Sequence, residues 1–394
     1  MASIIPDAYE GREQALVKHA LLKGYLEKLV LIIGMSPGAR HAGRVEICYV
    51  DCFAGPWGAP GAKLEGTSIA LSLETLAACK EKLATLGVTA TMRALYIEKD
   101  RAAFERLSKF LNEQAPKTVE HDCRHGDFVD LRSEILKWSG STAFAFFFVD
   151  PKGWKDIGIE NMRPLLQRAR SEFLINFAYN FINRSASMLE LQDAMVRLLG
   201  TTVELGGLQP VEREEKLVDA YRTSLKICVP HSQAEYRPRT AYVTVLDPLH
   251  ERTKYHLVYL TCHPTGIVEF MSISERVDVV QKQVRAAKQG EIRQKKTGMD
   301  DLFGSDVLQE NSDGRASPDD VDAFWRQYLA AGERRVGVSE FADILEDTKW
   351  PPSELHASLA RLVKAGVVCN LDANTAKRRT KLLHLKSAER LQLV

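Results

Sequence analysis

Short apolar runs alternate with segments of helical periodicity along much of the first half of this 394-residue chain. The runs VEICYVDCFAG, MRALYIEKD, TAFAFFFVDPKG and EFLINFAYNFINR lack the polar alternation of a half-exposed strand, which is typical of strands buried on both faces. Helices are predicted between them, at residues 67–87, 101–115, 130–138 and 161–171. Strands that alternate with helices predict βαβ units, and therefore an α/β fold built on a parallel sheet.

A different connection ends this pattern. Residues 240–248 and 255–264 form two further apolar runs, which only the segment LHERTK separates. A helical crossover between parallel strands needs about a dozen residues, so this pair is predicted to be an antiparallel hairpin. An amphipathic helix is predicted at residues 14–35, ahead of the first strand. The expected sheet is therefore parallel with an antiparallel hairpin at its end.

Composition narrows the class of protein. Hydrophobic residues make up 45% of the chain and charged residues 27%, as in ordinary globular proteins. No segment approaches the roughly 18 consecutive apolar residues of a membrane span, and the N-terminal residues lack the pattern of a secretory signal. The seven cysteines are scattered, so we expect reduced thiols used in packing and no metal site. These features predict a cytoplasmic protein with no membrane partner.

The length of the chain predicts two domains. Residues 284–318 are polar, charged and rich in turn-forming residues, which is typical of a linker. Apolar periodicity resumes after this segment. We therefore predict a first domain at residues 1–283, a linker at 284–318 and a second, smaller domain at 319–394.

The second domain has its own order of elements. Helices are predicted at 319–332, within 335–350 and at 351–368, with Ser339 as an N-cap and Gly366 as a C-cap. Two short strands, VVCNLD and TKLLHL, follow around a basic tip. Helices followed by a β-hairpin are the order of a winged helix-turn-helix domain.

Basic residues at the tip of this hairpin suit contacts with the phosphates of DNA or RNA. They are Lys377, Arg378, Arg379 and Lys381. Ser353, His356, Arg361 and Lys364 are available on the predicted recognition helix. Many winged helices bind proteins, and a basic tip can simply be solvated, so both alternatives stay open beside nucleic-acid binding.

Acidic residues and glycines recur where the predicted strands end. Asp51 is followed by the turn CFAGPWGAPG, which does not match the GxGxxG pattern of nicotinamide-binding folds. Glu98 ends the second strand, where an α/β cofactor fold uses a carboxylate to accept from ribose hydroxyls. Asp127 and Phe128 follow the third, and could meet an amine and a purine face. Asp150 ends the most apolar strand. Together these strand ends predict a cofactor cleft.

The segments VDCFAGPWG, LEGTSIAL, YIEKD and FFFVDPKG, in this order, resemble the three-Cys-motif partner protein (TcmP) family. The helix KHALLKGYLEKL and the strand YHLVYLTCHPTG are similar to that family as well, so the resemblance covers residues 10–283. It implies a Rossmann-like class I methyltransferase fold with S-adenosylmethionine as cofactor. The residues that it assigns to the cofactor are Asp51, Ala54 and Gly55 in the first loop, Glu98 at the ribose, and Asp127 with Phe128 at the adenine.

The resemblance also implies where catalysis would occur. Asp150 and Pro151 stand where many amino-methyltransferases carry an Asp-Pro-Pro-aromatic motif, but Lys152 and Gly153 replace its proline and aromatic, and Trp154 comes one place late. We predict Asp150 as the acceptor of a hydrogen from the nucleophile, with Lys152 or Trp154 at the substrate. Other candidates for the cleft, on the predicted strand at 172–184, are Asn176, Tyr179, Asn180 and Asn183.

Two functions follow from these predictions. The first is an S-adenosylmethionine-dependent methyltransferase that acts on nucleic acid, with the winged helix binding the substrate or a partner. The second is a regulatory or partner protein that binds S-adenosylmethionine or a nucleotide without catalysis. The cysteine motif in the family name belongs to a separate protein, so a three-Cys-motif protein is an expected partner.

Overall fold

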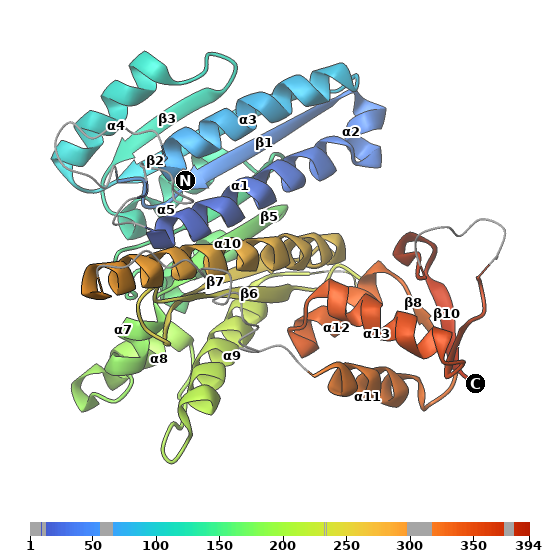
Figure 1. Ribbon diagram of the computed structural model, residues 1–394. Coiled ribbons are helices and arrows are strands. Elements are labelled where there is room, and N and C mark those ends of the chain that lie inside the picture. Colours follow the sequence, from blue (N-terminus) through green and yellow to red (C-terminus); the bar gives the residue numbers. More distant parts are fainter. Residues whose placement is uncertain are drawn as a thin grey trace.

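The main sheet of the protein has seven strands (Figure 1). The computed structural model describes residues 9, 13–55, 66–231, 233, 235–297, 317–373 and 382–394. The strand order is β3-β2-β1-β4-β5-β7-β6, and β7 runs antiparallel to the other six strands. The strands are β1 (Arg44–Asp51), β2 (Thr89–Glu98), β3 (Glu120–His125), β4 (Phe144–Val149), β5 (Ser171–Phe177), β6 (Arg239–Leu246) and β7 (Thr253–Thr261). The predicted α/β fold, a Rossmann-like class I methyltransferase sheet with a terminal hairpin, is confirmed.

Helices cover both faces of this sheet, because successive residues of each central strand point to opposite sides. In β4 every residue is buried, and Phe146 and Phe147 belong to the two different apolar cores. One core holds α1 (Glu13–Gly34), α3 (Ser68–Thr85), α4 (Arg101–Gln114) and α10 (Pro264–Thr297). The other holds α5 (Phe128–Ser139), α6 (Ile159–Leu166), α7 (Tyr179–Ser185), α8 (Gln192–Leu199) and α9 (Pro210–Cys228). The short helix α2 (Pro37–Ala42) precedes β1.

The described residues 317–373 and 382–394, here called the C-terminal unit, form a second, three-stranded antiparallel sheet with three α-helices (Figure 1). Its elements are α11 (Pro318–Leu329), β8 (Arg334–Val336), α12 (Val338–Thr348), α13 (Pro352–Lys364), β9 (Val368–Asn370) and β10 (Glu389–Leu393), and its strand order is β8-β10-β9. The fully buried Trp325 and Leu355 belong to the same apolar core as α1 and α10. The core on that face of the main sheet therefore continues into the C-terminal unit.

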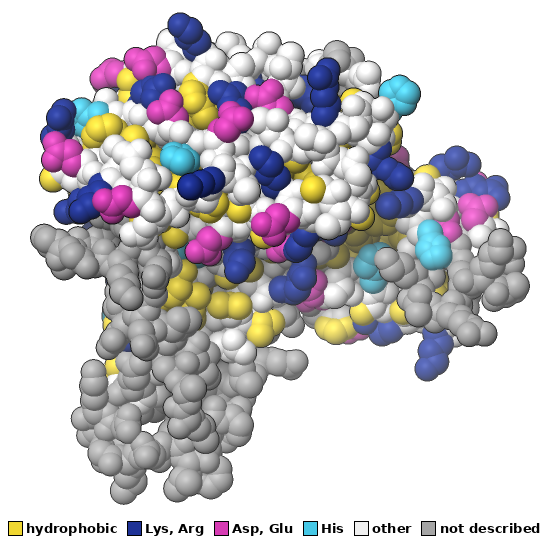
Figure 2. All heavy atoms as spheres, turned by 90° about the horizontal axis from the view of Figure 1, so that it is seen from above, with side chains coloured by type: hydrophobic (Ala, Val, Ile, Leu, Met, Phe, Trp, Pro, Cys, Tyr) yellow, Lys and Arg dark blue, Asp and Glu magenta, His cyan; other side chains and the backbone are white. Residues whose placement is uncertain are grey.

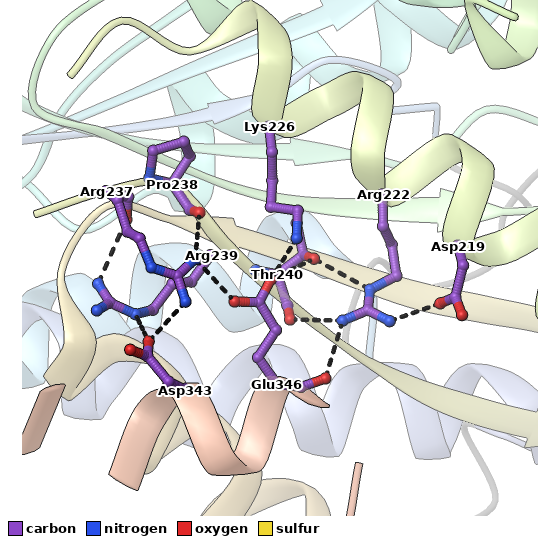
Figure 3. Close-up of polar contacts among 9 residues, drawn as sticks. All are labelled: Asp219, Arg222, Lys226, Arg237, Pro238, Arg239, Thr240, Asp343 and Glu346. Atoms are coloured by element: carbon purple, nitrogen blue, oxygen red, sulfur yellow. Dashed lines mark hydrogen bonds and ion pairs between the residues drawn. The ribbon is translucent and has the colours of Figure 1, made fainter. Parts of the chain in front are cut away.

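Polar contacts join the two parts (Figure 3). Glu346 of α12 is buried, and its carboxylate accepts from the backbone N–H of Thr240 on β6 at 3.0 Å and from Lys226 Nζ on α9 at 2.8 Å. Asp343, one turn earlier on α12, accepts from Arg237 Nη2 at 2.7 Å and from Arg239 Nε at 2.6 Å. α12 is thus joined to the edge strand β6 and its surroundings by partly buried charge pairs and by a hydrogen bond from the Thr240 main chain.

The strand predicted at residues 172–184 is wrong in its second half. β5 ends at Phe177 and α7 begins at Tyr179, because the buried residues Tyr179, Ile182 and Ser185 recur at helical spacing. Tyr179, Asn180 and Asn183 therefore lie on a helix and not on a strand.

The prediction of TKLLHL as the second strand of the hairpin in the C-terminal unit is also wrong. Residues 382–384 lie outside any strand, and β10 begins only at Glu389, after a 3₁₀ turn at Leu385–Ser387. Strand β8 escaped prediction because it has only three residues.

Three smaller predictions also need correction. Gly337, not Ser339, precedes the first turn of α12, and the Ser339 hydroxyl accepts from Arg239 instead. α10 continues to Thr297, beyond the boundary expected at residue 283. Cys369 is exposed, so it is not a packing residue, while Cys48, Cys52, Cys79 and Cys228 are buried as expected.

No helix among the described residues is long and apolar enough to cross a bilayer.

Candidate functional site

The loops that follow β1, β2, β3 and β4 meet at the carboxyl edge of the main sheet and enclose a pocket of about 790 Å³. Ligands of open α/β sheets bind at this edge, and the volume lies within the usual range of about 300–1,000 Å³. The residues that line it are Cys52, Phe53, Ile97, Glu98, Lys99, Asp100, Ala103, Arg106, Gly126, Phe128, Lys152, Gly153, Trp154, Lys155, Asp156 and Phe181. Glu98, Phe128, Lys152 and Trp154, all predicted from the sequence, are thus brought to one pocket.

Glu98 is the carboxylate at the end of β2. It is only 5% exposed, and its Oε1 accepts from the backbone N–H of Asp100 at 2.6 Å. Asp100 is itself the N-cap of α4, since its side chain accepts from Ala103 N. Among the described residues, the Glu98 carboxylate accepts a hydrogen bond through Oε1 only. Its Oε2 is therefore the acceptor that the hydroxyl of a ligand in the pocket can approach.

Asp51 organises the loop after β1 from beneath. It is fully buried, and it accepts from Phe53 N at 3.1 Å and from the Ser68 hydroxyl of α3 at 2.9 Å. Ala54 N donates to the carbonyl of Ile97 at 2.8 Å, which fixes the loop to the end of β2. Asp51 and Ala54 do not line the pocket, whereas Cys52 and Phe53 between them do. Gly55 is buried and is the last described residue of this loop.

Burial raises the pKa of Asp51 to about 7, and the charge of Asp150 adds to this effect, while the Ser68 and Phe53 hydrogen bonds and Lys18 oppose it. The ordinary pKa applies in the unfolded chain, so the carboxyl favours folding at low pH, and this contribution is lost as pH rises from about 4 to about 7. Asp51→Asn is therefore expected to be more stable than the native protein at pH 8, by up to about 4 kcal/mol. The difference should vanish near pH 4. Urea unfolding at both pH values measures it, and an equal difference at both would contradict this assignment.

The loop after β3 carries Gly126, Asp127 and Phe128. Gly126 has φ +153°, and a Cβ there would lie 3.0 Å from the Leu131 side chain, so glycine is needed at this turn. Asp127 is the N-cap of α5: its Oδ1 accepts from Val129 N at 2.9 Å. Phe128 lines the pocket together with Phe53, with the ring centroids 5.1 Å apart. The aromatic wall is therefore made by two rings, of which the sequence predicted one.

Asp150 lies directly after β4 and is held from two sides. Its Oδ1 accepts from Asn176 Nδ2 of β5 at 2.7 Å, and its Oδ2 pairs with Lys18 Nζ of α1. The side chain is 13% exposed. Lys18 escaped prediction because it lies within an amphipathic helix far from Asp150 in sequence. The carboxylate is thus fixed by one cation and one amide at the junction of β4 and β5.

The residues after Asp150 differ in exposure. Pro151 is buried beside it, Lys152 is exposed in the pocket wall, and Trp154 is buried in the same wall. Of the further candidates, Asn183 Oδ1 accepts from Arg213 Nε at 2.5 Å, and Tyr179 packs edge-on against His256 at 5.5 Å between ring centroids. Neither lines the pocket, nor does Asn180. Phe181, which lies on α7 between Tyr179 and Asn183, lines the pocket and was not predicted. It was missed because this segment was assigned to a strand and not to a helix.

The predicted nucleic-acid contacts Lys377, Arg378, Arg379 and Lys381 lie outside the described residues. On α13, Arg361 pairs with Asp322 at 2.6 Å, the Ser353 hydroxyl donates to Glu275 of α10, and the His356 ring stacks on Phe341. Lys364 is exposed. On the face drawn in Figure 2, basic and acidic side chains are interspersed over the surface that is not grey. A broad basic patch is therefore not a feature of that visible surface.

No protein-family model and no curated protein matches the chain. Among solved structures, protein LPL1258 from Legionella pneumophila, assigned to the family model DUF519, is similar at a TM-score of 0.37 and 10% identity, over 69% of this chain and 92% of that chain. A proposed methyltransferase, yhhF of Escherichia coli, has a TM-score of 0.24 and 15% identity, over 54% and 75%. A proposed O-methyltransferase from Klebsiella pneumoniae is similar at a TM-score of 0.29 and 11% identity, over 63% of this chain and 90% of that chain. Likenesses this distant transfer neither residues nor function.

Proposed function

We propose that the protein is an S-adenosylmethionine-dependent methyltransferase acting on nucleic acid. The observation that carries the proposal is the pocket at the carboxyl edge of the sheet, with buried Glu98 in its wall. The sheet, with its single antiparallel strand β7, is of the class I methyltransferase type. A pocket formed by the loops of successive strands suits an elongated ligand that passes over several strand ends.

The chemistry of the pocket residues fits this cofactor. Glu98 would accept from the ribose hydroxyls, as a carboxylate can accept two hydrogen bonds at once. Phe53 and Phe128 would lie against the adenine, because flat apolar rings exclude water from a purine face. These three residues come from the loops of β1, β2 and β3, so the adenosine would occupy that side of the pocket. The reactive end would then face the loop after β4, where Lys152 and Trp154 line the pocket; Asp150, at the start of this loop, is not among the lining residues.

When bound, the cofactor supplies an electrophilic methyl group on a sulfonium. The protein would contribute mainly by positioning the nucleophile in line with that methyl group. Asp150 would accept a hydrogen bond from the nucleophile and then its proton, which reaches water through the exposed part of the carboxylate. Lys18 and Asn176 would keep Asp150 in place for this task.

We assign binding of the nucleic acid, or of a protein partner, to the C-terminal unit acting as a winged helix. The order α11, β8, α12, α13, β9 and β10, with β10 central in the sheet, supports this assignment. The basic residues predicted to contact phosphates, at 377–381, lie outside the described residues, and their type alone supports this role. A three-Cys-motif protein remains the proposed partner from the sequence resemblance. Most of the polar side chains on α13 already have partners within the protein, so α13 itself is a weak candidate for contact.

Glu98→Ala is expected to weaken binding of S-adenosylmethionine by about thirtyfold, because it removes a charge-assisted pair of hydrogen bonds to the ribose. Isothermal titration calorimetry with S-adenosylmethionine and with S-adenosylhomocysteine measures the change. Glu105→Ala, which removes an exposed carboxylate on α4 that pairs with Arg101, is the matched control and should leave the affinity unchanged.

Two results would count against the proposal in different ways. No binding of either compound to the native protein would contradict the assigned cofactor. Binding without methyl transfer to any DNA, RNA or protein offered would support the alternative of a regulatory protein that senses the cofactor.

A further inference from the structure

Four cationic side chains line the pocket at the carboxyl edge of the main sheet. Arg106 belongs to α4, Lys152 and Lys155 to the loop after β4, and Lys99 to the turn after β2, and all four are exposed. S-adenosylmethionine carries a sulfonium, an ammonium and one carboxylate, so its net charge is positive and cations around it oppose its binding. These side chains therefore indicate an anionic ligand that reaches the same pocket.

Acidic side chains neutralise only part of this charge. The carboxylates that line the pocket are those of Glu98, Asp100 and Asp156. Lys99 lies in the acidic part of the wall, since it pairs with Asp127 of the loop after β3 at 3.7 Å. Arg106 and Lys155 form no ion pair with any residue that the structure describes. Their charges are therefore available to a ligand.

The cations and one exposed ring extend over the ends of neighbouring strands. Arg106 is on the helix after β2, the two lysines follow β4, and Phe181 is on α7, which follows β5. In the order β2-β1-β4-β5, the ends of β2 and β5 lie three strand spacings apart, or about 14 Å. A nucleoside monophosphate is shorter than this distance, whereas a chain of a few nucleotides spans it.

The ring of Phe181 favours a nucleic acid over another polyanion. It is 50% exposed although it lines the pocket, and the guanidinium of Arg184 lies 5.0 Å from its centroid. An exposed apolar ring is unfavourable in water unless something covers it. Aromatic rings beside arginine commonly stack on the bases of single-stranded nucleic acid. An acidic peptide would pair with the cations but carries no regular series of flat groups to cover the ring.

Given the proposed function, on which this inference rests, we propose that the pocket wall binds the backbone of a single-stranded nucleic acid. Its phosphates lie at Arg106, Lys152 and Lys155, and the base of a nucleotide at one end of this path stacks on Phe181. The strand passes over the pocket from α4 to α7, so a nucleotide between these contacts is the one presented for methylation. A duplex would first have to release that nucleotide, which costs unstacking and unpairing. This surface is separate from the C-terminal unit.

The test measures how binding depends on salt, by fluorescence anisotropy with the full chain and labelled single strands of RNA and of DNA, each of about 12 nucleotides. Replacing Arg106, Lys152 and Lys155 together by alanine should reduce the slope of log K against log salt by about 2. The reason is that each phosphate contact on a single strand contributes about 0.7 to this slope. The affinity should then be about 100-fold weaker at about 0.1 M salt and nearly native at about 1 M.

A charge-matched variant controls for the net charge of the protein. Arg44, Lys117 and Lys137 are also one arginine and two lysines, and they are exposed at the opposite edge of the sheet, where β1, β3 and β4 begin. Replacing these three by alanine should leave the slope and the affinity native. An equal change of slope in the two triple variants would show that total charge causes the effect, and would overturn the inference.

Phe181→Ala tests the stacking contact separately from the phosphates. It should weaken binding of the strand by about tenfold at every salt concentration without changing the slope, and Phe181→Tyr should bind like the native protein. Leu189→Ala removes an apolar side chain that is 88% exposed and close to α7 in sequence, and should also bind like the native protein. Equal losses in Phe181→Ala and Leu189→Ala would contradict the stacking contact.

Calorimetry with S-adenosylmethionine separates this inference from the proposed function. The variant without Arg106, Lys152 and Lys155 should bind the cofactor at least as tightly as the native protein, because these cations oppose a positive ligand. The inference is overturned if that variant loses cofactor affinity, if its slope is native, or if the native protein binds neither strand. It is also overturned if the slope falls only when Arg378 and Arg379 are replaced by alanine. A native protein that binds the strands as expected but not the cofactor would contradict the proposed function alone.

Discussion

Replacing Glu346 by alanine is expected to lower the free energy of unfolding by about 3 kcal/mol. The side chain is 4% exposed, and its carboxylate accepts from Lys226, Arg237 and the backbone N–H of Thr240 (Figure 3). Burial opposes its ionisation, yet the hydrogen bonds and charges of these partners lower the pKa of Glu346 below the usual value. Alanine would leave the Thr240 N–H without its acceptor and Lys226 without its counter-charge, while Arg237 would keep only its pair with Asp343. The value is at the low end for buried pairs because both cations keep some contact with water.

Urea unfolding, followed by circular dichroism and by tryptophan fluorescence, measures the decrease in the free energy of unfolding. Glu346→Gln keeps an acceptor for Thr240 and should lose less. The matched control is Asp347→Ala, at an exposed position of α12. Partial burial and then the charges of Glu346 and Asp343 raise the pKa of Asp347, so its carboxylate is not stabilised by its surroundings. Its removal should change stability by less than about 0.5 kcal/mol. An equal loss in both alanine variants would show that the effect arises within the helix and not from the charge cluster.

The strands of the main sheet and its terminal hairpin were predictable because they follow from local patterns. Short, completely apolar runs such as Phe144–Val149 are typical of strands buried on both faces, and a six-residue connection is too short for a helical crossover between parallel strands. The errors occur where one apolar run serves two elements. From Ser171 to Ser185 the chain stays apolar, and only the three-dimensional packing shows that a strand ends at Phe177. Short strands such as β8 carry too few residues for any period to be visible.

The candidate site was predictable where it depends on strand ends, and not where it depends on contacts between distant segments. Glu98 and Trp154 could be assigned to one edge of the sheet because the carboxyl ends of parallel strands meet there. Lys18 of the N-terminal helix pairs with Asp150, and no pattern in the sequence around either residue predicts this ion pair. The interface at Glu346 is of the same kind. Its acid lies on an amphipathic helix whose pattern predicts a buried face but not the arginines that the face meets.

Asp150→Ala is expected to lower the rate of methyl transfer by at least about 100-fold, because it removes the proposed acceptor of the nucleophile's hydrogen. It also leaves Lys18 without its counter-charge and Asn176 Nδ2 without its acceptor, so the geometry of the transfer site is lost as well. Binding of the cofactor should change by less than about threefold, since Glu98 and the aromatic pair lie at the other strand ends. Single-turnover transfer of a labelled methyl group from S-adenosylmethionine to single-stranded oligonucleotides gives the rate, and calorimetry gives the affinity.

Two companion variants make the interpretation of Asp150→Ala specific. Asp150→Asn keeps the shape and one acceptor oxygen but cannot take a proton, so its rate should lie between those of the native and alanine proteins. Glu160→Gln removes the charge of an exposed residue on α6, in the segment after β4, and should transfer at the native rate. If Asp150→Ala loses cofactor affinity and transfer in equal measure, Asp150 supports the fold of the pocket instead of the chemistry. A native transfer rate in Asp150→Ala would exclude the carboxylate from the reaction.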